Sequence, residues 1–585
     1  MTHSKIKNQA ETKTDELPAC AAEYIKLIIK KMRYRQSVRE DVKAELKAHF
    51  EDELKGYTTQ KEREQKAQQL ITDFGDAKLL AILLRRAKKR CRPLWRTIVA
   101  RSFQAIVAII LCFVLYVVWF YTGKPVITAD YLSELNRIAR PVADENLNAA
   151  PSYHKAVEMV KELPDDISRV LGKTFDETAS EEKQVLAKWL SNNEEILQLV
   201  IAGARKPYYW RQYATKRGTP DLMGVLLPDL SEFRKLARTL CWRAQLSAQA
   251  GQYENAFEDL KACYRFGQHL KTGGAFLIEQ LVGFAIQNLA AGNLRDILSR
   301  YEIDVSTLAK LQKDFEEIVA GEEFNIDLAA ERLAVFDVIQ RFFTGGLSGG
   351  HIIPKRVAEL FPDVQVIGLS GGGAGAVYPE KQKTDWLSEF ISDIGDVLSG
   401  AGKKAKKGGY ILFFHPDKRQ TYKATQQLYD YWDVLKLKTP GQVRAEGIVV
   451  EEEIKKITKG NIFLELMEPA FARCVELSYR NECSSKSLLA VIALMRYKGN
   501  NGCYPDNLGE LVTAGYLKEL PIDPYSNKPL VYKKTDDNFI LYSVGPDFAD
   551  NGGESGKDSQ GQVKKWRDNG DTVFWPELKP EASQP

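Results

Sequence analysis

Residues 102–123 read SFQAIVAIILCFVLYVVWFYTG and contain no charged side chain. A helix of this length rises by ~33 Å, enough to cross the ~30 Å hydrocarbon core of a bilayer. The alternative is a buried core helix, but such a helix would usually show a polar face, and here only Ser102 and Gln104 are clearly polar. The stretch therefore predicts a single transmembrane helix over residues 98–122.

The flanking charges predict how this helix is oriented. Eight Lys and Arg residues lie between residues 85 and 101, and no Asp or Glu occurs from Ala77 to Ala129. On the other side, Lys124 is the only charged residue before Asp130. Because cytoplasmic flanks are enriched in Lys and Arg, residues 1–101 are predicted to be cytoplasmic and residues 124–585 extracytoplasmic. The expected location is a bacterial cytoplasmic (inner) membrane.

The charge distribution and the cysteine content limit the kinds of molecule that the chain is expected to bind. Residues 1–101 hold 24 Lys and Arg against 14 Asp and Glu, a net charge of +10, whereas the whole chain carries +4. Positive charge confined to the end beside a membrane span favours anionic lipid head groups over nucleic acid. The eight Cys in 585 residues include no C-x-x-C pair, which argues against a disulfide scaffold and a zinc ribbon. Membrane lipid is the predicted partner, and nucleic acid is not.

The chain before the span is predicted to be a small helical domain. Residues 1–18 are polar and predicted to be a disordered tail, and residues 19–92 carry apolar side chains at helical spacing. Gly75 is expected to end one helix and Asp76 to cap the next. The expected buried faces are Tyr24, Leu27, Ile28 and Met32, followed by Val38, Val42, Leu46, Phe50 and Leu54.

The domain contains the predicted helix REDVKAELKAHFEDEL at residues 39–54, then Gly56-Tyr57-Thr58 and the stop Phe74-Gly75-Asp76-Ala77. With these pieces it resembles the HAAS or DUF1700-type helical domain, which also precedes membrane permeases. The resemblance covers about residues 20–90. The family implies a cytoplasmic protein-interaction module and implies no catalysis.

The first part of the external region, residues 124–343, is predicted to be helical. Residues 181–202, 230–250, 255–270 and 275–298 carry apolar side chains at steps of three and four. The bend around Gly251 resembles the turn of a tetratricopeptide hairpin, and an ordinary helical hairpin is the alternative. Across an antiparallel hairpin, Cys241 and Cys263 would lie nearly level. The hypotheses are a Cys241–Cys263 disulfide or two buried free thiols.

Residues 344–410 are rich in Gly, Ser and Lys and are predicted to be an insertion or linker, with a helical continuation over residues 411–483. Two G-x-S-x-G matches centre on Ser348 and Ser370, but a nucleophile elbow needs a strand before it and a helix after it. Chance clustering of Gly is the preferred interpretation. The six His residues form no H-E-x-x-H motif and are expected to be structural or at the surface.

The C-terminal region, residues 484–577, is predicted to be an α+β module followed by a tail at residues 578–585. A long helix is expected over residues 461–497, and then short strands, of which FILYSV at residues 539–544 is the clearest. The region contains, in order, Tyr504-Pro505, Leu520-Pro521, Asp523-Pro524, Tyr542-Ser543-Val544-Gly545, Asp547, Asp550, Gly552-Gly553 and a terminal Asp571-x-x-x-Trp575-Pro576. With these pieces the module resembles the globular part of the major (G-type) pseudopilin of type II secretion.

Two departures from that family matter. A pseudopilin has its membrane helix directly before this domain, whereas here the span lies far upstream, and Arg473 and Glu476 occupy the preceding helix. We therefore expect no pilin-like processing or polymerisation. The resemblance implies calcium in the loop after the last long strand, with Asp547 and Asp550 as metal ligands. Ile540 stands where the family often has an acid, and a solvated acidic turn is the alternative.

The sequence is compatible with three functions. The preferred one is a mainly α-helical, single-pass envelope scaffold or binding protein that is not an enzyme, with protein partners on both sides of the membrane. The alternative is a transmembrane regulator whose head contacts a cytoplasmic partner. An extracytoplasmic hydrolase is the weakest of the three, because no nucleophile, base and oxyanion donor can be assembled from the motifs.

Overall fold

The computed structural model describes residues 17–90, 94–160, 163–215, 222–225, 227, 229–320, 322, 324–346, 349–354, 356, 415–461, 464–465, 469–558 and 561–577. The chain is mainly helical, as predicted, and divides into two compact units, Met1–Val118 and Trp119–Pro585. Each unit is described separately below. Ser370, most of the Gly- and Lys-rich stretch and the tail at residues 578–585 lie outside the described residues.

The first unit begins with four helices around a small core of their own. They are α1 (Ala19–Lys31), α2 (Gln36–Leu54), α3 (Gln60–Phe74) and α4 (Ala77–Arg90). The predicted four-residue stripe of α2 is confirmed, since Val42, Leu46, Phe50 and Leu54 are buried. The placement of Leu27 in the core is wrong, because 43% of this residue is exposed. Ile25 is buried instead, on the helical face that also carries Ala21 and Ile28.

The turn between α3 and α4 confirms the prediction that Gly75 ends one helix and that Asp76 caps the next. Gly75 has φ of 75°, a conformation that glycine adopts without steric cost. The Asp76 carboxylate accepts hydrogen bonds from the backbone N–H groups of Lys78 (2.7 Å) and Leu79 (2.9 Å) and so caps α4. The Tyr24 hydroxyl donates to the Gly75 carbonyl at 2.8 Å, which fastens this turn to α1.

Helix α5 (Leu94–Tyr121) contains the predicted span. Within the described part of the chain, Ile98–Tyr121 is the one helical stretch long and apolar enough to cross a membrane, judged by length and composition. Its apolar side chains are exposed in the protein, as in Phe103 (66%) and Ile109 (68%), and they form a continuous hydrophobic surface. A helix with this surface needs an apolar environment around it.

The second unit begins with stacked helices. These are α6 (Tyr131–Ala139), η1 (Glu145–Leu147), α7 (Ala150–Val160), α8 (Asp165–Leu171), α9 (Ser180–Asn192), α10 (Glu194–Ala204), η2 (Leu222–Gly224), α11 (Leu230–Gln249), α12 (Tyr253–Gly273), α13 (Leu277–Arg300), α14 (Val305–Ala320) and α15 (Ala329–Phe342). The hairpin of α11 and α12 turns at Gly251, with φ of 74°, as predicted. The helical stretch expected over residues 181–202 breaks at Asn193, which ends α9 and precedes α10.

Later helices and a small sheet complete this unit. The helices are α18 (Lys418–Leu435), α19 (Pro440–Ala445), α20 (Val450–Thr458), α22 (Pro469–Asn501) and α23 (Gly509–Thr513). The strands β3 (Val531–Lys534), β4 (Phe539–Ser543) and β5 (Thr572–Trp575) form an antiparallel sheet in that order, and β1 (Ile522–Asp523) pairs with β2 (Lys528–Pro529). Helix α22 packs on β4 and β5, which confirms the predicted helix-on-sheet arrangement.

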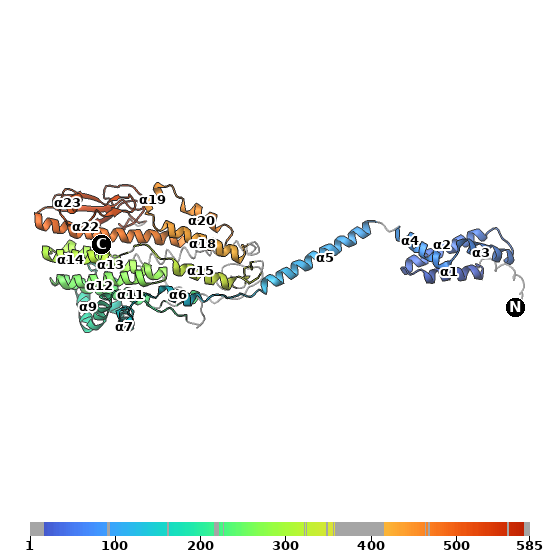
Figure 1. Ribbon diagram of the computed structural model, residues 1–585, viewed down its shortest axis with the longest axis horizontal. Helices are drawn as coiled ribbons and strands as arrows, with labels where there is room; N and C mark the ends of the chain where they lie inside the picture. Colours follow the sequence, from blue (N-terminus) through green and yellow to red (C-terminus); the bar gives the residue numbers. More distant parts are fainter. Residues whose placement is uncertain are drawn as a thin grey trace, which may run out of the picture. The chain divides into compact units, whose positions relative to one another are not determined.

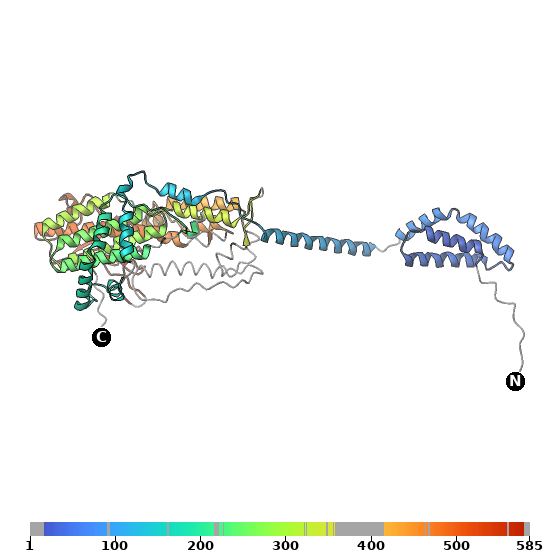
Figure 2. The same cartoon turned by 90° about the horizontal axis from the view of Figure 1, so that it is seen from below.

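Helix α22 also joins the sheet to the helical hairpins (Figures 1 and 2). It packs against α13 and α14 as well as the strands. One hydrophobic cluster contains Leu240 and Leu294 from the hairpins together with Leu488, Leu541 and Trp575 from the C-terminal region. The stacked helices and the C-terminal region of this unit therefore share a single core.

The beginning of the Gly-rich stretch is packed against the end of α5. His351 stacks on Phe120 with ring centroids 4.9 Å apart, and its Nε2 lies 3.2 Å from the Phe120 carbonyl oxygen. Its backbone N–H donates to Thr344 Oγ1 at 3.0 Å. Burial lowers the pKa of His351, so the neutral ring is favoured in this structural position.

Candidate functional site

The predicted calcium loop begins just after β4. Asp547 accepts hydrogen bonds from the backbone N–H of Ala549 (3.0 Å, Oδ1) and from the Asn551 side-chain amide (2.7 Å, Oδ2). The backbone carbonyl of Asp547 accepts from the Arg444 guanidinium at 3.2 Å. Both carboxylate oxygens of Asp547 therefore stabilise the turn itself.

Asp550 holds the same loop against the sheet. Its Oδ1 accepts from the Tyr542 hydroxyl on β4 (2.8 Å) and from the backbone N–H of Gly552 (2.9 Å). The Tyr542 hydrogen bond is the largest of the contributions that lower the pKa of Asp550. This carboxylate is thus charged at neutral pH and fixed in position.

Asp571 is a third acid at this loop and is not among the predicted metal ligands. It lies just before β5, is buried, and accepts from the backbone N–H groups of Asn551 (3.2 Å) and Gly553 (2.6 Å). Burial is the main cause of its raised pKa, and the charges of Asp550 and Asp547 add to the effect. Its position within the terminal match before Trp575 is the sequence signal that could have identified it.

The loop supplies oxygen atoms, which calcium prefers as ligands, but these atoms do not form a coordination site that is ready to bind the ion. Hard cations take six to eight oxygens, and this loop supplies carboxylates and carbonyls. The Asp547 oxygens and Asp550 Oδ1, however, accept hydrogen bonds from the loop and from β4. Among the described residues no group of three or more His, Cys, Asp or Glu side chains is arranged to hold a metal. A cation at Asp547 and Asp550 would have to displace the Asn551 amide.

The two hairpin cysteines lie side by side, as their predicted level positions require. The sulfur atoms of Cys241 and Cys263 are 3.7 Å apart and are not bonded to each other. Both side chains are buried, and burial raises the pKa of the Cys241 thiol well above its usual value. A buried, protonated thiol reacts slowly.

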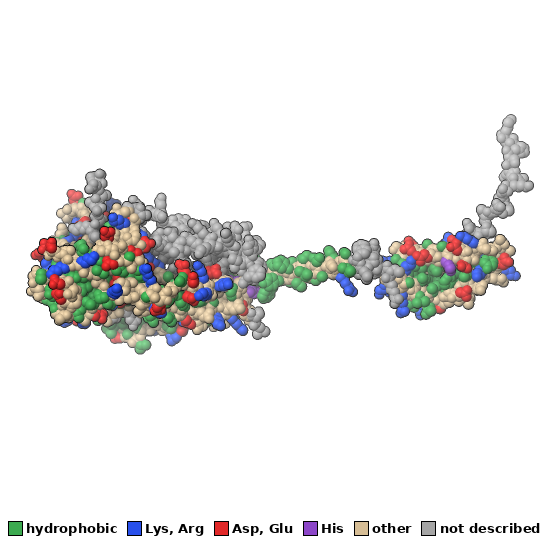
Figure 3. Space-filling view, turned by 90° about the horizontal axis from the view of Figure 1, so that it is seen from above, with side chains coloured by type: hydrophobic (Ala, Val, Ile, Leu, Met, Phe, Trp, Pro, Cys, Tyr) green, Lys and Arg blue, Asp and Glu red, His purple; other side chains and the backbone are tan. Residues whose placement is uncertain are grey.

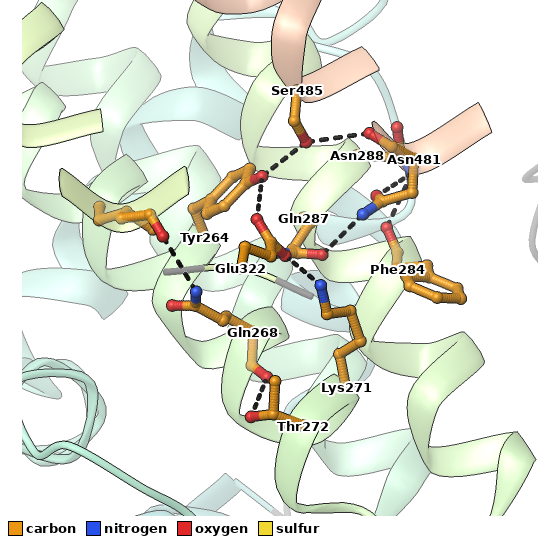
Figure 4. A network of polar contacts seen from close by, with 11 residues as sticks. Tyr264, Gln268, Lys271, Thr272, Phe284, Gln287, Asn288, Glu322, Asn481 and Ser485 are labelled. Carbon is orange, nitrogen blue, oxygen red and sulfur yellow. Dashed lines mark hydrogen bonds and ion pairs between the residues drawn. The ribbon is translucent and has the colours of Figure 1, made fainter. Parts of the chain in front are cut away.

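The most developed polar site among the described residues is a buried network of hydrogen bonds (Figure 4). No sequence motif predicts it. Lys271, near the end of α12, donates to Glu322 Oε1 at 2.6 Å, and the two side chains are only 2% and 0% exposed. Gln287 on α13 donates to the same oxygen at 2.5 Å. Tyr264 donates to Glu322 Oε2 at 3.1 Å, so the carboxylate accepts three hydrogen bonds.

The network continues onto α22. Ser485 Oγ lies 2.6 Å from the Tyr264 hydroxyl, and it donates to the Asn481 carbonyl oxygen at 2.9 Å. The Asn481 side-chain amide donates to Gln287 Oε1 at 2.9 Å, and Asn288 donates to Asn481 Oδ1 at 2.8 Å. Figure 4 shows these side chains pointing toward one another from α12, α13 and α22. Since the members satisfy one another, the network can fix α22 on the hairpins.

The two G-x-S-x-G matches, which are attributed to chance clustering of Gly, centre on Ser348 and Ser370, and both residues lie outside the described residues. No protein-family model, curated protein or solved structure matches the chain.

Proposed function

We propose that the protein is a single-pass membrane protein of the bacterial envelope, whose extracytoplasmic body acts as a scaffold or binding platform. The observation that carries the proposal is α5, an apolar helix of bilayer length with exposed side chains and a strongly basic flank on one side. The inferred location is the cytoplasmic (inner) membrane, with residues 1–101 cytoplasmic and the body outside.

The architecture of the body, which comprises the stacked helices and the C-terminal sheet of the second unit, supports a binding role rather than catalysis. Stacked helical hairpins typically present extended surfaces to proteins or peptides. The buried charges of Lys271 and Glu322 are used to join α12, α13 and α22, and their side chains are almost fully covered. The C-terminal sheet shares the core of the hairpins, so the pseudopilin-like region would serve as part of one rigid platform.

A regulatory role is the second candidate, and the head supports it. Helices α1 to α4, here called the head, enclose their own hydrophobic core, which supports a distinct module that would lie in the cytoplasm. The HAAS-like pattern of this module is typical of protein interaction. In this alternative the body would sense a condition outside, and the head would relay it to a soluble partner.

In vivo crosslinking followed by purification of the intact protein tests these roles. A scaffold is expected to retain its envelope partners when residues 1–90 are deleted. A regulator is expected to lose a cytoplasmic partner on the same deletion. Recovery of the protein without any crosslinked partner, from both the full chain and the deletion variant, would contradict both roles.

A further inference from the structure

Helix α4 presents an apolar face that the head does not cover. Leu79, Ile82 and Leu83 are 62%, 43% and 52% exposed, and their spacing of three and four places them on one side of the helix. The opposite side is used by the head, because Ala77 and Ala81 are buried in its core. Helix α4 therefore has two apolar faces. One packs into the core of the head, and the other is exposed.

Basic side chains border the outward face. Lys78, Arg85 and Lys89 are exposed and share one flank of the apolar stripe, and Arg86 lies within it. Lys88, in contrast, pairs with Glu45 of α2 at 2.5 Å. No Asp or Glu occurs from Ala77 to Ala129, so this flank meets no acid of its own helix. Space-filling views show hydrophobic and basic side chains side by side on the surface of the head (Figure 3).

The chain keeps this face close to a bilayer. Arg90 ends α4, and Ile98 begins the apolar stretch of α5. Eight residues span at most ~28 Å even when fully extended. The length of α4 itself is ~21 Å. Wherever α5 crosses a membrane, α4 is thus tethered within reach of the head-group layer.

We propose that α4 lies on the membrane surface, with Leu79, Ile82 and Leu83 inserted among the lipids and Lys78, Arg85 and Lys89 against anionic head groups. The inference rests on the proposed anchorage by α5. Apolar side chains flanked by Lys and Arg are the features of interfacial helices, whose affinity combines buried apolar area with attraction to anionic lipid. The head would then be docked to the bilayer rather than held away from it on a free tether.

Photocrosslinking of the full-length protein in lipid nanodiscs tests the proposal. A benzophenone amino acid replaces Leu83 or, as a matched control, the exposed Gln65 of α3. Nanodiscs contain phosphatidylcholine alone or with phosphatidylglycerol. We expect lipid adducts at position 83 to exceed those at position 65, and to rise by at least about fivefold when phosphatidylglycerol is added, the effect of a single basic residue near an anionic surface.

Charge reversal provides the second arm. The triple variant Lys78→Glu, Arg85→Glu, Lys89→Glu is expected to reduce the adduct at position 83 to the level in phosphatidylcholine. The matched variant Lys43→Glu, Lys55→Glu, Lys61→Glu reverses exposed charges on α2, on the turn after it and on α3, and should leave the adduct unchanged. Arg92, Arg96 and Arg101 remain in both, so the span keeps its basic flank.

Four results would overturn the inference. Equal lipid adducts at positions 83 and 65, or adducts insensitive to the triple reversal, would show that α4 is not a specific lipid contact. Adducts from position 83 to a second copy of the chain would identify the face as a dimer interface. Release of the protein from membranes by carbonate would contradict the anchorage itself, and with it the proposed function, whereas the other three results leave that function intact.

Discussion

Lys271 Nζ lies 2.6 Å from Glu322 Oε1 in the interior of the body, where both side chains are almost fully removed from solvent. Separating two buried charges leaves one of them without compensation, which costs far more than breaking an exposed pair. Because Gln287 and Tyr264 donate to the same carboxylate, the pair organises the contact of α12 and α13 with α22. The attachment of the C-terminal region thus depends on two residues near the middle of the chain.

Lys271→Met is therefore expected to destabilise the body by about 3–5 kcal/mol, since Glu322 would remain buried and charged. Adding Glu322→Gln should restore part of the loss, because no charge then stays buried. The control is Lys310→Met, which breaks the exposed Lys310–Glu254 pair (3.5 Å) and should cost less than about 1 kcal/mol. Denaturant unfolding of the purified protein provides the comparison. Equal losses for Lys271→Met and Lys310→Met would contradict the role of the buried pair.

The cysteines of the α11–α12 hairpin are expected to behave as two buried thiols. Their sulfurs are 3.7 Å apart without a bond, and the pKa of Cys241 is raised by burial. Under non-reducing conditions, alkylation should modify the exposed Cys503 in the folded protein and reach Cys241 and Cys263 only after denaturation. Mass spectrometry of unreduced peptides gives the answer. A Cys241–Cys263 linked peptide would contradict this expectation and show that the two sulfurs can form a disulfide.

The buried carboxyl group of Glu331 is expected to make the folded protein less stable as pH rises. Burial raises its pKa from 4.5 to about 8, although its Oε1 accepts a hydrogen bond from the backbone N–H of Leu277. Between these two pH values the folded chain keeps this proton and the unfolded chain releases it, so folding becomes less favourable as pH rises. Glu331→Gln should flatten the decline in melting temperature between pH 5 and pH 8. An unchanged slope in the variant would assign the pH dependence to other groups.

The calcium expectation for Asp547 and Asp550 has a direct test. Calcium bound only to the folded protein stabilises it by RT ln(1 + [L]/Kd), ~2.7 kcal/mol at a hundredfold excess over Kd. A site would then appear as a higher melting temperature with calcium than with chelator, lost in Asp547→Ala and retained in Asp568→Ala, an exposed acid outside the loop. A melting temperature that does not respond to calcium would leave the hydrogen-bonded turn as the whole role of these residues.

Local features were predictable where the physics is local. The four-residue stripe of α2, the positive φ of Gly75 and Gly251, the Asp76 cap and the strand FILYS depend on neighbours in sequence. Leu27 was misplaced because two adjacent faces of α1 are both apolar, and only the packing of α2 to α4 selects between them. Periodicity alone does not contain that information.

The buried network could not be predicted, because it is assembled from distant segments. Lys271 and Glu322 are separated by 51 residues, and Tyr264 and Ser485 by 221. Residues of these types occur in many helices and are mostly exposed at least in part. The sequence around them therefore does not indicate a buried network. The hydrogen bonds from the backbone of residues 551–553 to Asp571 likewise form only when β5 pairs with β4.

The orientation of the chain across the membrane is the measurement on which the account most depends. Alkaline phosphatase folds to its active form outside the cytoplasm, so it reports the side on which a fusion point lies. We predict high activity for a fusion after Pro585 and background activity when the enzyme is inserted after Lys89 with the rest of the chain retained, because the basic flank before α5 favours the cytoplasmic side. Activity after Lys89 together with an inactive fusion after Pro585 would contradict the orientation, the extracytoplasmic platform and the cytoplasmic head alike.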